Sequence, residues 1–511
     1  MNSSYGITAL VLVSVATLAI GAYGLRFSRT TSDFFVASRS VRPALNASAI
    51  GGEYLSAASF LGVAGLVLAF GTDMLWYPVG WTAGYLMLLV LVAAPLRRSG
   101  AYTLPDFAET RLESKPVRRL SSVLVVAIGW LYLMPQFKGA GLSLGTVAET
   151  PAWVGGLLVA TVVLVNVLSG GMRSITFVQA FQYWLKLTAL LVPVMFLLTV
   201  WTGDGAISPA DASVVVDGVP GDVWATPLGA VNEHPMYTTY SIIIATFLGT
   251  MGLPHVVVRF YTNPDGRAAR RTTLVVLGLL GLFYILPPAY GALGRIYAPD
   301  LLASGREDAV VLELPARMIE GVGGDLLSAL TTAGAFAAFL STSSGLTIAV
   351  AGVLGQDVLS RRFSGVTAFR LGAVIAVVVP LVLAIGSGGV GVAKAVGLAF
   401  AFAASTFCPL LVLGIWWRRL TDVGAMAGLL VGGTLAGFAV VDTLLLSERS
   451  GWVGSLLSQP AAWTVPTTFA TMILVSLATR RRVPLHVSRT MVRLHTPEAV
   501  ALDRGPERFQ Y

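Results

Sequence analysis

The sequence predicts an all-α integral membrane protein with thirteen transmembrane helices. Of its 511 residues, 55% are hydrophobic and only 12% are charged, whereas a soluble domain carries about 25% charged residues. The hydrophobic residues form runs of about 20, the length of an α-helix that crosses a bilayer. Two of these runs contain glycines and polar groups, which a membrane helix tolerates only where it faces protein or a water-filled cavity.

Thirteen apolar runs follow one another along the chain, and each is long enough to cross a membrane. They lie near residues 5–25, 45–70, 74–96, 118–145, 152–170, 175–201, 236–257, 272–296, 326–356, 368–386, 390–417, 422–446 and 460–479.

The basic residues predict the orientation of these runs. The connections after odd-numbered runs carry pairs such as Arg97/Arg98 and Arg418/Arg419, whereas the acidic connection 202–235 has no Lys or Arg. The positive-inside rule therefore places the N-terminus outside and the C-terminal tail in the cytoplasm. Because the arginines are distributed among the connections, topology explains the net charge of +8, and we expect no nucleic-acid partner.

The second run has the features of a binding site. It contains Gly51-Gly52, the carboxylate of Glu53 and several hydroxyls. We expect this helix to be interrupted, with freed carbonyls directed at a cation and a small solute. Glu53 is either a functional group, for example a proton carrier, or a structural one, as one half of an internal ion pair with Lys or Arg or as a carboxyl kept protonated.

The seventh run repeats this design with Gly249, Gly252 and Pro254. Its segment ATFLGTMGL (245–253) matches ASFLGVAGL (58–66) at six of nine positions. The two runs are five apart and so cross the membrane in opposite directions. Broken helices at corresponding places in inverted halves indicate a transporter binding site. His255, beside the break, is either a proton-sensitive gate or a hydrogen-bonded structural histidine.

The sixth and ninth runs carry further polar groups at membrane depth. Four consecutive hydroxyls, residues 341–344, suit an alkali cation, although such hydroxyls also bond to their own helix. Lys186 lies four residues from Gln182 and seven from Gln179, so these three side chains share one helix face. We expect that face to point into the helix bundle.

Three segments resemble the sodium/solute symporter family, and within it the acetate permease and monocarboxylate transporter branch. They are SDFFVASRSVRPALNASAIGGEYLSAASFLG (32–62), TMGLPHVVVRFYT (250–262) and VGLAFAFAASTFCPLLVLGIWWRRLTDVGAMAGLLVGG (396–433). The similarity covers essentially the whole chain. It implies a LeuT-like five-plus-five inverted repeat of helices whose first and sixth core helices are broken.

The resemblance also implies a division of the chain. Residues 1–44 would form a peripheral first helix and a cytoplasmic link, 45–201 the first repeat, 202–235 an extracellular loop, 236–417 the second repeat, 418–479 two peripheral helices, and 480–511 a cytoplasmic tail.

The family's functional residues map onto this sequence by motif. The cation-binding residues would be Gly52, Leu55, Ala338, Ser341 and Thr342, with Gln179 at the cation exit. The substrate-binding residues would be Tyr54, Ser56, Ala57, Phe60, Gln136, Thr246, Gly249 and Thr250.

The implied function is secondary active symport of a short-chain monocarboxylate (acetate, propionate or pyruvate class) with sodium by alternating access. The expected partners are this carboxylate, the sodium ion and membrane lipid, without a cofactor, in the inner membrane of a bacterium. The need for a small membrane subunit is left open. One alternative is proton-coupled symport that uses Glu53 or Lys186, and a weaker one is a sensor on a transporter fold. Since the chain has no HExxH or GxSxG motif and no paired His or Cys cluster, we do not expect an enzyme.

Overall fold

The computed structural model describes residues 3–24, 37, 41–212, 220–228, 233–386, 391–445 and 449–500, and every regular element in these residues is a helix. The predicted all-α fold is therefore confirmed for this part of the chain. The first predicted basic connection, with Arg26, Arg29 and Arg39, lies outside the described residues.

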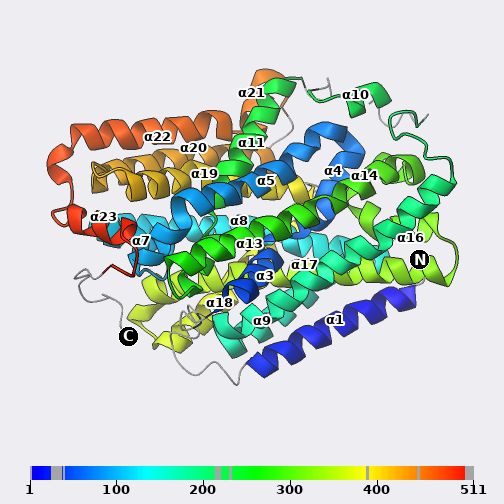
Figure 1. Cartoon of the computed structure of the whole chain (residues 1–511), viewed down its shortest axis with the longest axis horizontal. Coiled ribbons are helices and arrows are strands. Elements are labelled where there is room, and N and C mark those ends of the chain that lie inside the picture. Colours follow the sequence, from blue (N-terminus) through cyan, green and yellow to red (C-terminus); the bar gives the residue numbers. More distant parts are fainter. Residues whose placement is uncertain are drawn as a thin grey trace.

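The longer elements are named in Figure 1. They are α1 (Ser3–Gly24), α3 (Pro43–Tyr54), α4 (Val63–Phe70), α5 (Trp76–Met87), α6 (Ala93–Ser99), α7 (Leu104–Leu112), α8 (Lys115–Ala148), α9 (Ala152–Gly203), α10 (Gly221–Ala225), α11 (Pro235–Gly252), α12 (Pro254–Val258), α13 (Gly266–Tyr284), α14 (Leu286–Tyr297), α15 (Asp300–Ala303), α16 (Val310–Met318), α17 (Val322–Val353), α18 (Gly365–Gly386), α19 (Val392–Trp416), α20 (Asp422–Leu445), α21 (Gly451–Ser458), α22 (Ala461–Ala478) and α23 (Val487–His495). Three short elements matter below: η3 (Ala58–Gly62), η6 (Arg259–Thr262) and η8 (Leu354–Val358).

The described residues contain 11 helices that are long and apolar enough to cross a membrane. One continuous span, Ala58–Ser99, includes the end of the second predicted run and the third run. Another, α9, includes the fifth and sixth runs, which meet at Gly171 with φ 59 and ψ −158. Since neighbouring runs merge in this way, the count of thirteen crossings stays a prediction.

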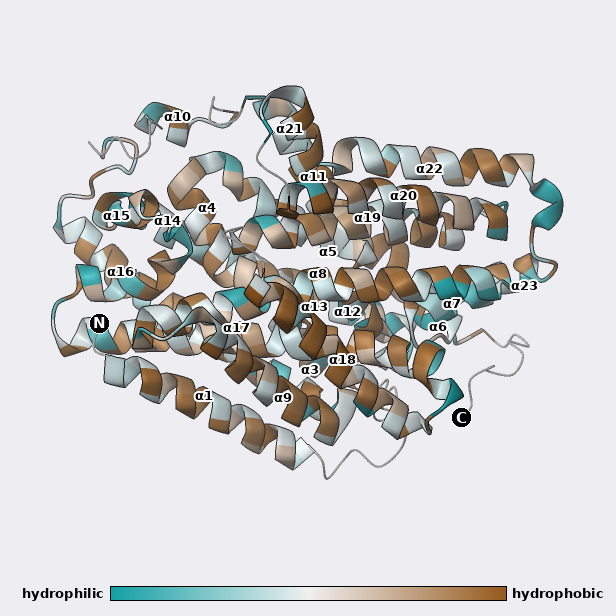
Figure 2. Cartoon of the chain, turned by 180° about the vertical axis from the view of Figure 1, so that it is seen from behind, coloured by the Kyte–Doolittle hydropathy of each residue, from teal (hydrophilic) through white to brown (hydrophobic). Residues whose placement is uncertain are grey.

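Two helices form the centre of the bundle. In the apolar membrane-crossing stretch of α17 all residues are buried, and in that of α19 94% are buried. In contrast, α1 lies at one edge along α9, and α20 and α22 lie at the opposite edge (Figure 1). Many outward-facing residues of the peripheral helices are hydrophobic (Figure 2), as expected of a protein in lipid. The start of α1 and the helix α23 lie at opposite ends of the bundle.

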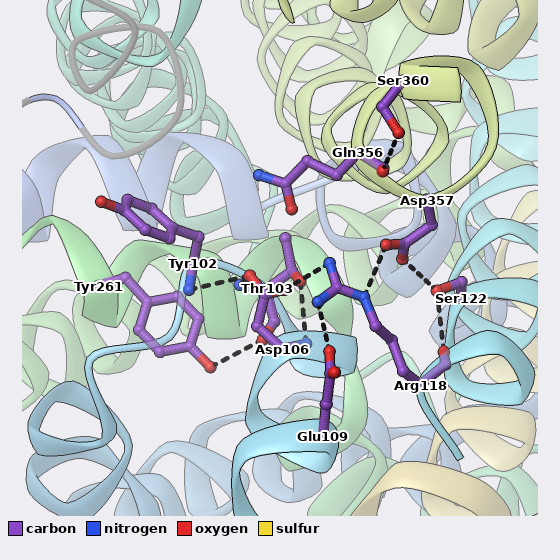
Figure 3. A network of polar contacts seen from close by, with 10 residues as sticks. All are labelled: Tyr102, Thr103, Asp106, Glu109, Arg118, Ser122, Tyr261, Gln356, Asp357 and Ser360. Carbon is purple, nitrogen blue, oxygen red and sulfur yellow. Dashed lines mark hydrogen bonds and ion pairs between the residues drawn. The ribbon is translucent and has the colours of Figure 1, made fainter. Parts of the chain in front are cut away.

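The short helix α7 is fixed to the end of the bundle by one arginine. Arg118 of α8 pairs with Asp106 at 2.8 Å, Glu109 at 2.6 Å and Asp357 of η8 at 2.7 Å (Figure 3). Thr103 and Asp106 form a capping box at the start of α7, which satisfies backbone N–H groups at that end. These contacts join α7, α8 and η8.

Candidate functional site

The first broken helix has its interruption after the predicted glycines. The helix α3 ends at Tyr54, Leu55 has φ −73 and ψ 87, and the helix resumes at η3. The predicted break is therefore confirmed, but Gly51 and Gly52 are helical, contrary to our expectation that they cause it. They allow close packing instead, since a Cβ on Gly52 would lie 2.0 Å from the Gln179 carbonyl oxygen of α9.

The second broken helix is interrupted at Leu253, between α11 and α12. Leu253 has φ −74 and ψ 118, and Pro254 begins α12. Gly249 and Gly252 lie directly against α19, where added Cβ atoms would come within 2.4 and 2.3 Å of backbone carbonyl oxygens. The predicted interruption of the seventh run is confirmed.

The predicted cation ligands converge on the ammonium group of Lys186. Lys186 Nζ donates to the carbonyl oxygen of Gly52, to that of Leu55 at 2.6 Å and to Ser341 Oγ at 2.6 Å. All of these residues are buried. Three N–H donors thus meet three neutral oxygens, which matches the donor capacity of an ammonium group.

The remaining predicted ligands lie around this centre. Ser341 Oγ is 3.1 Å from the Ala338 carbonyl oxygen, and Thr342 Oγ1 donates to the Glu53 carbonyl oxygen at 2.6 Å. Gln179 Nε2 donates to the Ser341 carbonyl oxygen at 2.8 Å. The hydroxyls of Ser341 and Thr342 therefore face α9 and α3 rather than lipid. We name the oxygens of Gly52, Leu55 and Ser341 the cation cage.

The cation cage joins three elements that are far apart in sequence. Its oxygens come from the break after α3 and from the middle of α17, and the ammonium group comes from α9. A cation at this position holds the broken helix against α17. Neutral oxygens suit a monovalent ion that has to bind and leave again, because hard oxygen ligands suit hard cations and no ligand charge holds the ion.

The predicted substrate residues connect the two breaks. Tyr54 OH lies 2.9 Å from Thr250 Oγ1 of α11 and donates to the Trp81 carbonyl oxygen at 3.3 Å. The Ala57 N–H donates to Gln136 Oε1 at 3.0 Å. Tyr54, Ala57, Gln136 and Thr250 are thus brought together in pairs across α3, α8 and α11.

The other predicted substrate residues are buried without a polar contact between the two breaks. Thr246 Oγ1 donates to the Ile242 carbonyl oxygen of its own helix at 2.7 Å, and Gly249 packs on the backbone of Phe400. The ring of Phe60 contacts Phe283, with centroids 6.3 Å apart. Ser56 is buried at the break itself.

An aromatic cluster that the sequence analysis did not single out surrounds Tyr54. The ring centroid of Tyr54 lies 4.7 Å from that of Tyr85 and 6.3 Å from that of Phe400, and Trp81 lies 5.6 Å from Phe400. Trp81 and Tyr85 are four residues apart on α5, so both point to the same side. The sequence signal that could have identified this cluster is the pair Trp81 and Tyr85, two aromatic residues with polar tips that lie four positions apart in an apolar run.

Glu53 forms an internal ion pair, which was one of the interpretations of its sequence position. Arg259 of η6 donates from Nε to Glu53 Oε2 at 2.5 Å and from Nη1 to Thr176 Oγ1 at 2.9 Å. Both side chains of the pair are 2% exposed or less. Arg259 directly follows the seventh predicted run (236–257), where the positive-inside rule assigns it to a basic connection, and its burial against Glu53 corrects that assignment.

The Glu53 carboxylate depends on a glycine of α17 for its space. A Cβ added to Gly345 would lie 2.1 Å from Glu53 Oε1, closer than atoms can approach without a shift. Glycine at this position therefore allows the ion pair to pack against the hydroxyl-rich helix.

His255 is buried beside the second break. Its ring centroid lies 5.2 Å from that of Tyr132. Among the described residues neither ring nitrogen has a hydrogen-bond partner, so the expected hydrogen bond of a structural histidine is not found there.

Comparisons with known proteins agree with this architecture. The model of the sodium:solute symporter family matches residues 34–432. The chain is 31% identical over 448 residues to the uncharacterized symporter YwcA of Bacillus subtilis (strain 168), covering 84% of this chain and 85% of the relative.

Solved structures of transporters share the fold. A Na+-coupled sialic acid symporter in a substrate-bound outward-open state has a TM-score of 0.68 at 16% identity and covers 92% of this chain and 97% of its own. Mhp1, a nucleobase-cation-symport-1 family transporter, has a TM-score of 0.53 at 14% identity and covers 90% and 98%. A manganese transporter of Eremococcus coleocola has a TM-score of 0.54 at 17% identity and covers 87% and 95%. These likenesses confirm the predicted fold class.

Proposed function

The chain belongs to the sodium:solute symporter family, and from that membership we propose that it imports a short-chain monocarboxylate together with sodium by alternating access. The substrate would be an acid of the acetate, propionate and pyruvate class. The chain is a multi-pass membrane protein with transporter relatives rather than an enzyme. A bacterial inner membrane with the N-terminus outside remains the proposed location.

One observation carries the proposal: the oxygens of the cation cage bind a positively charged group between the first broken helix and α17. Sodium would take the place of the Lys186 ammonium on these oxygens, and Ala338 and Thr342 would complete the ligand set. An ion in this position would tie α3 to α17. The sodium gradient would then supply about 2.3 kcal/mol per charge for each 100 mV of membrane potential.

The residues around Tyr54 support a small carboxylic acid as the substrate. Aromatic rings from α5 and α19 surround Tyr54, and Tyr54 and Thr250 are hydrogen-bonded to each other. A sugar would need a larger set of free polar partners, because each of its hydroxyls has to be satisfied in a buried site. A short acid has one polar group and a small apolar part.

Proton coupling is the second candidate, and the contacts of Lys186 favour it specifically. The ammonium group already takes all three oxygens of the cation cage, so a proton on Lys186 could act as the coupling ion. Glu53, the other proton carrier considered, is paired with Arg259, which makes Lys186 the stronger choice. No contact in the described residues specifically favours a sensor.

Uptake into proteoliposomes tests both candidates. Labelled acetate and propionate are supplied under an imposed sodium gradient and, separately, a proton gradient. We expect sodium to drive accumulation and Ser341→Ala to weaken sodium activation at least about tenfold, since loss of even an outer partner costs a metal site that much. Under proton coupling, Lys186→Met abolishes accumulation instead, and the wild type does not respond to sodium.

Thr332→Ala is the matched control, because the Thr332 hydroxyl lies on the same helix and bonds to Ser328 of that helix at 2.8 Å. It should leave sodium activation unchanged. Failure of both gradients to drive accumulation of either acid contradicts the proposed function.

A further inference from the structure

The guanidinium group of Arg259 is only partly used by its neighbours. Its Nε and Nη1 bond to Glu53 and Thr176, whereas Nη2 has no hydrogen-bond partner among the described residues. The side chain is 1% exposed. A buried N–H of a charged group without a partner is costly, so this arrangement needs an explanation in terms of what the group binds.

Two further side chains, Tyr85 and His255, carry buried polar atoms without partners in the described part of the chain. The Tyr85 hydroxyl and both ring nitrogens of His255 are buried and make no hydrogen bond within the described ranges. Tyr85 and His255 are each close enough to Arg259 to interact with it electrostatically, and Tyr85 also with Glu53. These groups come from α5, α12 and η6, and His255 and Arg259 follow the second break within two and six residues.

The partner that Arg259 now holds has the same chemistry as the proposed substrate. The side chain of Glu53 from Cβ onward has the three-carbon carboxylate skeleton of propionate. Guanidinium groups bind carboxylates through two N–H donors in one plane, and in Arg259 Nε holds Glu53 while Nη2 has no partner among the described residues. An incoming carboxylate and Glu53 therefore compete for one cation.

From this competition we propose that Arg259 binds the carboxylate of the transported acid in exchange with Glu53. The inference rests on the proposed function, and it assigns Arg259, Tyr85 and His255 to a subsite beyond the breaks. Because Glu53 stays in the buried site after the exchange, the arriving acid adds one negative charge there, and the sodium ion that enters with the acid in the proposed function balances it.

The exchange also explains how a carboxylate loosens this end of the bundle. Glu53 belongs to α3, and Arg259 to η6, directly after α12. Their ion pair connects the two broken helices on one side of the breaks. A bound acid takes Glu53's place on Arg259 and releases this connection, whereas a neutral solute of the same shape does not.

Binding of labelled propionate to the purified full-length protein in sodium-containing buffer tests the exchange. Glu53→Gln removes the competing charge and should tighten propionate binding by about tenfold or more, and it should slow propionate release. Arg259→Lys keeps the charge without the planar fork and should weaken binding by a similar factor. Propionamide should not compete in the wild type.

Glu109→Gln is the matched control, because it also removes the charge of a carboxylate that pairs with an arginine. Its partner Arg118 has all three nitrogens bonded. This variant should keep its propionate affinity within twofold of wild type. If Glu53→Gln or Arg259→Lys does not fold, the double variant Glu53→Gln/Arg259→Gln removes both charges and should bind propionate at least about tenfold more weakly. If the folded variants bind propionate as tightly as the wild type, the exchange is overturned but the proposed function is not. If the wild type binds neither propionate nor acetate, the proposed function is overturned as well.

Discussion

Arg118 and Arg259 are both arginines that face carboxylates inside the protein, yet their surroundings differ. Arg118 uses Nε, Nη1 and Nη2 on three different carboxylates from α7 and η8 (Figure 3). Arg259 has one carboxylate, one threonine hydroxyl and one nitrogen without a partner among the described residues. The first arginine has more negative charge around it than it can neutralise, and the second has a donor to spare.

The difference separates a fixed contact from an exchangeable one. A guanidinium group whose three nitrogens all bond to carboxylates gains little from a new anion, so Arg118 is suited to holding α7 on α8 and η8. A guanidinium group with a free donor gains a hydrogen bond when an anion arrives. The two arginines therefore predict different responses to mutation, to added volume and to pH.

Arg118→Met should give the largest loss of stability. It leaves Asp106, Glu109 and Asp357 facing one another without a counter-charge, and breaking a buried pair costs about 3–5 kcal/mol. Arg259→Met leaves only one carboxylate and should cost less. Thermal unfolding in detergent measures both, with the exposed neighbour Arg119→Met as the control, expected within about 0.5 kcal/mol of wild type. An equal loss from Arg118→Met and Arg259→Met would remove the distinction between the two sites.

Gly345→Ala should affect the Arg259 site and spare the Arg118 site. The added Cβ would lie 2.1 Å from Glu53 Oε1, so the carboxylate has to move away from Arg259. Overpacking of this kind costs about 1–3 kcal/mol, and sodium-driven propionate uptake should fall with it. Gly278→Ala is the control, since nothing lies within 4 Å of its Cβ position. Normal uptake by Gly345→Ala would show that Glu53 does not need its present position.

The fold and the cation cage were largely predictable because composition and backbone chemistry determine them. Runs of about 20 apolar residues predict membrane helices, and interrupted runs expose carbonyls that need a partner. The predicted ligands Gly52, Leu55 and Ser341 accordingly meet at one point. Gly51 and Gly52 were misread, because glycine serves close helix packing as readily as it interrupts a helix.

The ion pair of Glu53 and the occupant of the cage could not be predicted in the same way. Arg259 lies 206 residues from Glu53, and an arginine at the end of an apolar run looks like a positive-inside residue. Lys186 was expected to face the bundle, but its contact with the cage depends on how α9 crosses α3. Such long-range pairings follow from tertiary packing, which local sequence patterns do not contain.

A pH experiment should give the smallest effect and tests the surplus of carboxylates around Arg118. Asp106 lies in α7, between the membrane spans, and burial raises its pKa from 3.8 to about 6, against the opposing influence of Arg118. Because this pKa is higher in the folded protein than in the unfolded chain, the folded state binds the proton more tightly. Stability from this group therefore rises as the pH falls from 8 to 5, by about 1 kcal/mol. Asp106→Asn lacks the titrating group, so the melting temperature of the wild type relative to this variant should increase over the same range. If the difference in melting temperature between the wild type and Asp106→Asn stays constant between pH 8 and 5, Arg118 neutralises its partners completely. Arg118 and Arg259 would then differ in hydrogen bonding but not in charge balance.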